Sequence, residues 1–225
     1  MTILSLKNIV YTHKKNQVTV LEDVTINFSM GKVYGILGKS GVGKTTLLAL
    51  LAGISTVDSG SILFKEQNLE LIDRNQYRQK EIGTIFQQYN VLSQVSALRF
   101  LKLCAISSAK QSYDDCYFYE LLKKVGLDKK LANQPIQKLS VSNQQRVYLA
   151  KAVVNDPQII LLDDPTKSLS ELSLAMVMSY LRIYAKNEKK CIIVSSESKE
   201  IADYVDELWG LNGRKLSFIK DVLEN

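Results

Sequence analysis

The sequence is poor in the residues that build several common functional sites. His13 is the only histidine, so a histidine-based metal site or a Ser-His-Asp triad elsewhere in the chain is excluded. The three cysteines, Cys104, Cys116 and Cys191, are too far apart for a close-spaced metal motif. We therefore interpret them as reduced, partly buried thiols.

Long apolar runs are also missing. No stretch approaches the ~18–20 apolar residues that a membrane-spanning helix needs. Residues 1–7 lack the basic start and the apolar core of a signal peptide. We therefore expect a cytosolic location. The 225 residues, of which 46% are hydrophobic, are enough for a sizeable core with one or two lobes.

The charge of the chain is unbalanced but dispersed. A net charge of +6 would favour nucleic acid or an anionic membrane surface as a partner. However, the lysines occur as scattered pairs, such as Lys14-Lys15 and Lys189-Lys190, and form no long basic block. A solvated surface is the simpler interpretation, and no nucleic-acid partner is expected.

One glycine-rich segment carries a pattern with its own chemistry. Residues 38–45 read Gly-Lys-Ser-Gly-Val-Gly-Lys-Thr, which fits the phosphate-loop pattern of a glycine, four residues and then Gly-Lys-Thr. The glycines allow a tight fold that turns backbone N–H groups toward phosphate oxygens. Lys44 would reach the outer phosphates, and the Thr45 hydroxyl would hold Mg²⁺. The alternative is an ordinary glycine-rich turn.

The neighbours of this segment favour phosphate binding. The apolar run 33–37 predicts a buried strand before it, and residues 46–52 predict a helix after it, which ends at Gly53. Phosphate binding needs this order, because a helix N-terminus adds its own attraction for anions. The loop residues expected to bind nucleotide are Gly38, Lys39, Ser40, Gly41, Val42, Gly43, Lys44, Thr45 and Thr46.

A second candidate cluster follows another buried strand, predicted at 159–162, which runs directly into Asp163 and Asp164. Buried strands place side chains at the carboxyl edge of a sheet, beside the phosphate loop. Asp163 would then hold Mg²⁺ through water, opposite Thr45, and Asp164 would orient or deprotonate an attacking water. The alternative, an acidic surface turn, fits less well because four apolar residues come before the pair.

The rest of the chain predicts a mixed α/β fold. Further strands are expected at 3–10, 18–28, 62–64, 82–86 and 191–194, and a hairpin with a tight Asn212-Gly213 turn at 208–219. Helices are expected at 75–80, 97–106, 114–125, 144–155, 171–186 and 199–205. We interpret about 90–135 as a helical subdomain inserted into an α/β core of about 1–89 and 136–225.

The order of these features resembles the nucleotide-binding subunit of an ABC transporter over nearly the whole chain. The segments that carry the resemblance are Tyr11, the phosphate loop, Gln87 within 85–92, the signature-like stretch 139–146, and 161–166. The resemblance implies that Tyr11 stacks on adenine and that Gln87 touches Mg²⁺ and faces the membrane partner. It also implies that Ser140 contacts the outer phosphate of ATP on another subunit. The residues around Gln87 and the chain length look most like the lipoprotein-release, macrolide-export and antimicrobial-peptide-transport branch.

The same resemblance implies a fold, cofactors and partners. The fold is a P-loop NTPase, in which residues 1–225 form one ABC-type domain with a RecA-like α/β core, an antiparallel β subdomain and the inserted helices. The cofactors are ATP and Mg²⁺, and the catalytic residues are Lys44, Gln87 and Asp164. The partners are a transmembrane permease subunit and a second ATP-binding subunit, identical or different. The chain would lie peripherally at the inner face of the cell membrane.

Four features depart from the family pattern. Val141, Ser142 and Asn143 replace the last three residues of Leu-Ser-Gly-Gly-Gln, Asp164 replaces a glutamate, Ser170 an aspartate, and Ser196 the switch histidine. Valine adds bulk where glycine allows close approach. The Asp164 carboxylate sits one methylene further back, so it should hold the attacking water less well. We therefore expect ATP binding with slow hydrolysis.

Three functions stay open from the sequence. The first is an ATPase that drives a membrane permease. The second is a binding module that dimerises on ATP and gates or regulates a transporter or sensor without useful turnover. The third, an ABC ATPase acting on nucleic acid or ribosomes, is disfavoured because such relatives usually carry two nucleotide domains or long coiled-coil insertions. The sequence does not identify the cargo.

Overall fold

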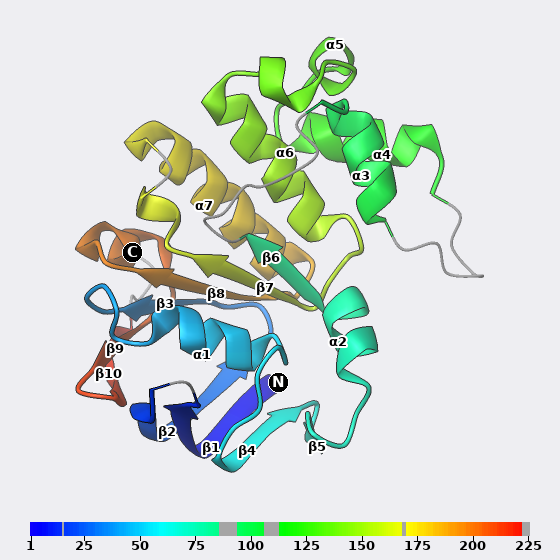
Figure 1. Cartoon of the computed structure of the whole chain (residues 1–225). Helices are drawn as coiled ribbons and strands as arrows, with labels where there is room; N and C mark the ends of the chain where they lie inside the picture. Colours follow the sequence, from blue (N-terminus) through cyan, green and yellow to red (C-terminus); the bar gives the residue numbers. More distant parts are fainter. Residues whose placement is uncertain (15, 86–93, 106–112, 168–169, 222–225) are drawn as a thin grey trace.

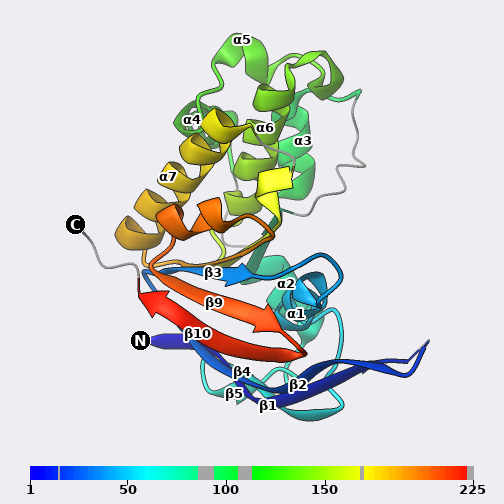
Figure 2. The same ribbon diagram turned by 90° about the vertical axis from the view of Figure 1, so that its left-hand side faces the viewer.

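Two β-sheets and the helices around them form the molecule in the computed structural model, which describes residues 1–14, 16–85, 94–105, 113–167 and 170–221. A six-stranded sheet lies in the middle, a four-stranded sheet lies on one side of it, and one helix, α1, is held between the two (Figure 1). Figure 2 shows the same layers from the side, with helices α3–α7 on the opposite face of the central sheet.

The central sheet is mostly parallel. Its strand order is β10 (Lys215–Asp221), β9 (Glu207–Asn212), β3 (Val33–Leu37), β8 (Cys191–Ser196), β7 (Ile159–Asp163) and β6 (Ile82–Ile85). Only β10 runs antiparallel to its neighbour. Because β3, β8 and β7 point the same way, the segments after their last residues meet at one edge of the sheet.

The second sheet is antiparallel and covers the N-terminal part of the chain. Its order is β2 (Val18–Ser29), β1 (Thr2–His13), β4 (Ser59–Phe64) and β5 (Gln67–Asn68). One face is buried against α1 (Lys44–Leu51), so apolar side chains such as Leu6 and Phe28 alternate with exposed ones. Apolar burial of this kind fixes the register, because a slip of one residue would expose the whole apolar set.

Side chains of the central strands alternate between two apolar clusters. Ile160 and Leu162 of β7 face the helical side, whereas Ile159 and Leu161 face α1 and the antiparallel sheet. All four are fully buried. This is why the strand reads as a continuous apolar run: both faces of a parallel sheet are covered.

Except for α1, the α-helices of the described residues begin at polar capping residues. After α2 (Arg74–Lys80) come α3 (Ala97–Cys104), α4 (Asp115–Lys124), α5 (Lys129–Ala132), α6 (Val141–Val153) and α7 (Glu171–Asn187). Three short 3-10 helices are η1 (Ile136–Lys138), η2 (Pro165–Lys167) and η3 (Lys199–Tyr204). Side chains of Ser96, Asp114, Ser140 and Ser170 accept hydrogen bonds from first-turn N–H groups, which otherwise lack partners. None of the helices in the described residues is long and apolar enough to span a bilayer.

Gly83 explains how closely β6 lies against α6. A Cβ atom at this position would be 2.1 Å from the carbonyl oxygen of Ala152, so only glycine permits the approach. The contact joins the helical side of the molecule to the central sheet at the strand that precedes residues 86–93.

The sequence-based prediction of an α/β fold with parallel and antiparallel sheets is confirmed. Two details were wrong. The hairpin turn consists of Gly213 and Arg214, both at positive φ as in a type I′ turn, because Asn212 still pairs with Lys215. Helix α6 begins at Val141 rather than near Gln144, because Ser140 caps it. The subdomain boundaries near 90 and 135 stay a prediction.

Candidate nucleotide-binding site

The glycine-rich segment connects β3 to α1, as the sequence predicts. Gly43 precedes the first residue of α1 at φ 112°, and Gly41 has φ 74°, conformations that favour glycine. A Cβ atom at Gly43 would also lie 2.5 Å from the Cγ1 atom of Val20, so the loop packs directly on β2. No side chain caps α1, which leaves its first N–H groups for another acceptor.

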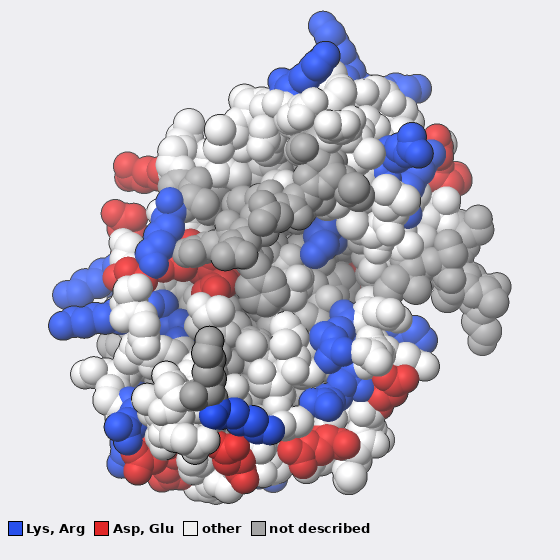
Figure 3. Space-filling view, viewed as in Figure 1, with Lys and Arg blue, Asp and Glu red and all other residues white. Residues whose placement is uncertain are grey.

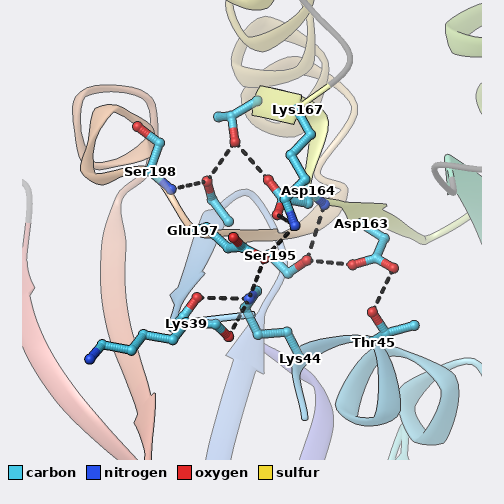
Figure 4. A network of polar contacts seen from close by, with 12 residues as sticks. Lys39, Lys44, Thr45, Asp163, Asp164, Lys167, Ser195, Glu197 and Ser198 are labelled. Atoms are coloured by element: carbon cyan, nitrogen blue, oxygen red, sulfur yellow. Dashed lines mark hydrogen bonds and ion pairs between the residues drawn. The ribbon is translucent and has the colours of Figure 1, made fainter. Parts of the chain in front are cut away.

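Lys44 is almost fully buried beneath this loop. Its side chain is 6% exposed, and its ammonium donates to the carbonyl oxygens of Gly38 at 2.7 Å and Lys39 at 2.9 Å. The side chain of Lys39 extends away from this group (Figure 4). The loop therefore presents one fixed cation at the N-terminus of α1, a combination that suits phosphate oxygens.

Asp163 links the loop to the end of β7. The Thr45 hydroxyl donates to Asp163 Oδ2 at 2.8 Å, and the Ser195 hydroxyl donates to Asp163 Oδ1 at 2.8 Å (Figure 4). Ser195 lies opposite Asp163 in the parallel β7–β8 pair. Two donors therefore fix the orientation of one carboxylate beside a hydroxyl.

Thr45 and Asp163 fit a magnesium ion. Both offer oxygen atoms, the ligand type that Mg²⁺ prefers, and magnesium is commonly held by one or two carboxylates together with phosphate oxygens. The described residues contain no group of three or more His, Cys, Asp or Glu side chains placed to hold a metal. The donor set thus matches a cation shared with a phosphate ligand better than a cage built by protein alone.

Asp164 is tightly held in an unusual backbone conformation. It has φ 47° and is 2% exposed. Its Oδ1 atom accepts a hydrogen bond from the Thr166 hydroxyl at 2.7 Å, and its Oδ2 atom lies 3.1 Å from the ammonium of Lys167. The same Thr166 oxygen is 3.0 Å from the hydroxyl oxygen of Ser196, which is fully buried. Asp164 and Ser196, two of the departures found in the sequence, thus share one partner.

Two charged residues that sequence reasoning missed complete this network. The ammonium of Lys167 contacts Glu197 Oε1, and Lys44 Nζ lies 3.7 Å from the same oxygen (Figure 4). The hydrogen bond from Lys167 lowers the pKa of Glu197, and Glu197 together with Asp164 raises the pKa of Lys167. Only their closeness to Asp164 and Ser196 in the chain could have identified them.

These side chains line a cleft of about 440 Å³, within the usual range for ligand sites. The lining residues are His13, Asn16, Val18, Val20, Ser40, Gly41, Gly43, Lys44, Thr45, Thr46, Asp163, Asp164, Lys167 and Glu197. A larger cleft of about 560 Å³ between α4, α6 and α7 contains none of the predicted site residues. Size alone therefore does not locate the site.

Outside the phosphate loop, the predicted residues Tyr11 and Ser140 do not line this cleft. Tyr11 is half-buried on β1 outside the lining, while His13, whose ring meets Tyr11 edge-on at a centroid distance of 5.4 Å, lines the cleft. His13 Nε2 is 3.5 Å from the Thr46 hydroxyl oxygen. Ser140 is exposed at the start of α6, where its hydroxyl caps the helix. Gln87 falls outside the described residues.

The signature-like stretch forms a separate exposed feature. Val141, the first residue of α6, is 68% exposed, and Ser140 does not line the cleft. Leu172 in the first turn of α7 is 85% exposed. The first turns of both helices thus carry an exposed apolar side chain.

Comparison with known proteins assigns these motifs to a family. The model of the ABC transporter family matches residues 21–167. An uncharacterized ABC transporter ATP-binding protein of Bacillus subtilis, YclH, is 31% identical over 92% of this chain and 92% of its own length. The lipoprotein-releasing system ATP-binding protein LolD of Ehrlichia chaffeensis is 33% identical over 89% and 88%. Among solved structures, a dimer of the ATP-binding cassette MJ0796 bound to ADP and Pi superposes with a TM-score of 0.87 at 25% identity, covering 99% of this chain and 100% of that one.

Proposed function

Because the chain belongs to the ABC transporter family, as an ATP-binding subunit of a bacterial transporter, we propose that it binds Mg-ATP in the phosphate-loop cleft and hydrolyses it slowly. Hydrolysis would occur at a dimer interface and would drive or gate a membrane permease. The observation that carries the proposal is the 2.8 Å hydrogen bond from Thr45 to Asp163, which joins the phosphate loop to the edge of the sheet beside Lys44.

Different residues of the cleft would contact the phosphates, the Mg²⁺ ion and the adenine. The N–H groups at the start of α1 and the ammonium of Lys44 would hold the phosphates. Thr45 and Asp163 would hold Mg²⁺, with Gln87 as a further contact, and the bound cation would neutralise phosphate charge. His13, which lines the cleft, would lie near the adenine, and Tyr11, whose ring contacts His13 edge-on, would support it from outside the lining. Ser140 would contact the outer phosphate of ATP bound to a second subunit.

Asp164 is the group best placed to orient a water molecule, and its contacts favour slow turnover. Its carboxylate is short, nearly buried and already engaged by Thr166 and Lys167. A general base must reach the proton that it removes. While Lys167 pairs with Oδ2, a water molecule has to compete with that ammonium for the same oxygen.

Relatives and surface features support the proposed partners. LolD is named as the ATP-binding protein of a lipoprotein-releasing system, and the MJ0796 cassette is dimeric. We extend both arrangements to this chain: a permease subunit, and a second ATP-binding subunit that contacts the exposed starts of α6 and α7. The protein would then lie at the inner face of the membrane. On the face in Figure 3, basic and acidic side chains are interspersed among the residues that are not grey, and this face offers nucleic acid no continuous basic stripe.

Phosphate release from the purified protein tests the proposal. We expect slow release that needs Mg²⁺, rises more than linearly with protein concentration, and disappears in Lys44→Ala. Asp164→Glu should raise the rate, because its longer side chain reaches further. Lys199→Ala, which removes an exposed lysine outside the cleft, is the control.

The same variants distinguish the slow ATPase from the second candidate function, a regulatory module without turnover. Nucleotide binding that depends on Lys44 but gives no phosphate release, even with Asp164→Glu, would favour a regulatory module without turnover. The contacts that engage Asp164 and Ser196 favour this candidate. Release at a rate typical of the family would contradict the slow-turnover proposal.

A further inference from the structure

The outer end of the phosphate cleft contains three charged side chains in mutual contact. Glu197, just after β8, lies between Lys44 of the phosphate loop and Lys167 at the end of η2 (Figure 4). Lys44 is almost buried, whereas the side chains of Lys167 and Glu197 are 45% and 30% exposed. The buried cation is thus fixed, and the two outer groups have room to move.

The position of Glu197 has an electrostatic consequence. Its carboxylate uses the ammonium of Lys44, which is the same group that the outer phosphate of a nucleotide needs. Two anions so close together repel each other, and a phosphate oxygen offers the lysines the same kind of charge-assisted contact as a carboxylate. Bound phosphate and Glu197 therefore compete for the same cations.

We propose that Glu197 and Lys167 form a latch, in which the terminal phosphate of a nucleoside triphosphate replaces Glu197 on Lys44 and Lys167. This inference rests on the proposed function, because it assumes that the cleft binds nucleotide. Lys167 then becomes a ligand of the third phosphate, which a diphosphate does not have. The latch makes this chain sense the triphosphate through a residue outside the phosphate loop.

The latch also links binding to the position of Asp164. In the latched arrangement, Lys167 Nζ lies 3.1 Å from Asp164 Oδ2. When Lys167 turns to the phosphate, Asp164 keeps its hydrogen bond from Thr166 and loses its ionic partner. Oδ2 of Asp164 then no longer shares its charge with the ammonium and can accept a hydrogen bond from water without that competition.

Titration calorimetry of the full chain with Mg²⁺, using ADP and the slowly hydrolysed triphosphate AMP-PNP, tests the latch. Lys167→Met should weaken AMP-PNP binding about tenfold, equivalent to about 1.4 kcal/mol, and change ADP binding less than about twofold. Glu197→Gln should strengthen AMP-PNP binding by about threefold or more, because the competing charge is gone.

Matched variants control for charge and for folding. Lys199→Met and Glu200→Gln remove exposed charges from η3, outside the cleft, and should leave both affinities unchanged. Thermal unfolding of each variant checks that it is folded. Should Lys167→Met fail to fold, Glu197→Gln decides the question, because it keeps the shape of the side chain.

The outcomes separate the latch from the proposed function. If the wild-type chain binds neither nucleotide, both ideas fail. If binding depends on Lys44 but Lys167→Met keeps the full preference for AMP-PNP over ADP, only the latch is overturned. Equal losses of AMP-PNP and ADP affinity, or weaker AMP-PNP binding in Glu197→Gln, would overturn it as well.

Discussion

Ser195→Ala would test how Asp163 is held at the edge of the sheet. Ser195 is fully buried, and its hydroxyl makes two contacts: it donates to Asp163 Oδ1 at 2.8 Å and accepts from the N–H of Asp164 at 3.1 Å. The substitution removes both and leaves the packing almost unchanged. It therefore isolates the hydrogen bonds.

The expected loss of stability follows from what each partner keeps. Asp163 retains the hydrogen bond from Thr45, and the Asp164 N–H retains the carbonyl oxygen of Ser195 at 3.1 Å, so no group is left without a partner. The main loss is one hydrogen bond to a charged group, about 1.5–3 kcal/mol. For a chain of 225 residues, such a loss lowers the melting temperature by about 3–12 °C.

The functional effect should appear in the magnesium requirement. Hydrogen bonds that orient a metal-binding side chain contribute about 10- to 100-fold to metal affinity. We expect Ser195→Ala to need about tenfold more Mg²⁺ for half-maximal nucleotide binding, measured by calorimetry beside thermal unfolding. Ser217→Ala, an exposed serine on β10, should change stability by less than about 0.5 kcal/mol. Wild-type stability and magnesium requirement in Ser195→Ala would refute the reasoning.

Two further predictions address ion pairing and thiol chemistry. Lys190 is 4% exposed and pairs with Asp156 at 2.8 Å, so Asp156→Asn should destabilise the fold by about 1–3 kcal/mol in urea unfolding. The exposed ion pair of Asp115 should contribute less than about 1 kcal/mol in Asp115→Asn, and equal effects would contradict the role of burial. Burial raises the pKa of the Cys191 thiol, so iodoacetamide at pH 8 should modify exposed Cys116 in the folded protein and Cys191 only after unfolding. Mass spectrometry that finds Cys191 modified in the folded protein would show that β8 opens.

The predictable part of the fold is the part that is fixed by local patterns. The run 159–162 identified β7 because both faces of a central parallel strand are apolar. The phosphate loop was predictable because its glycines are required by backbone geometry, as Gly41 and Gly43 confirm with positive φ angles. Asp163 meets Thr45 as expected, because parallel strands end at a common edge.

The missed part depends on contacts between distant segments. Lys167 and Glu197 are ordinary charged residues in the sequence, and only the adjacency of β7 and β8 brings them together. The same applies to His13, which reaches the cleft because β1 carries it past Tyr11 to the edge of the antiparallel sheet. Neither the periodicity nor the spacing of residues in the sequence predicts such long-range contacts.

The departures from the family pattern are not independent of one another. Asp164 and Ser196 both contact Thr166, and Asp164 is joined to the latch through Lys167. Residues in one network have non-additive effects, so restoring a glutamate at 164 changes the surroundings of the other positions as well. Double-mutant cycles are therefore needed to measure the coupling energy between Asp164 and its neighbours.

The signature-like stretch is separate from the Asp164 network. Val141 is 68% exposed, and Ser140 contacts the first turn of its own helix rather than the cleft. In the proposed dimer, a change there would act on nucleotide in a second subunit, whereas a change at Asp164 would act on the chain's own site. Pairing with an unlike subunit would consequently give two different clefts: one with this chain's Asp164 network and one with its Val141. Comparing Asp164→Glu with Val141→Gly in the same heterodimer would show which cleft limits phosphate release.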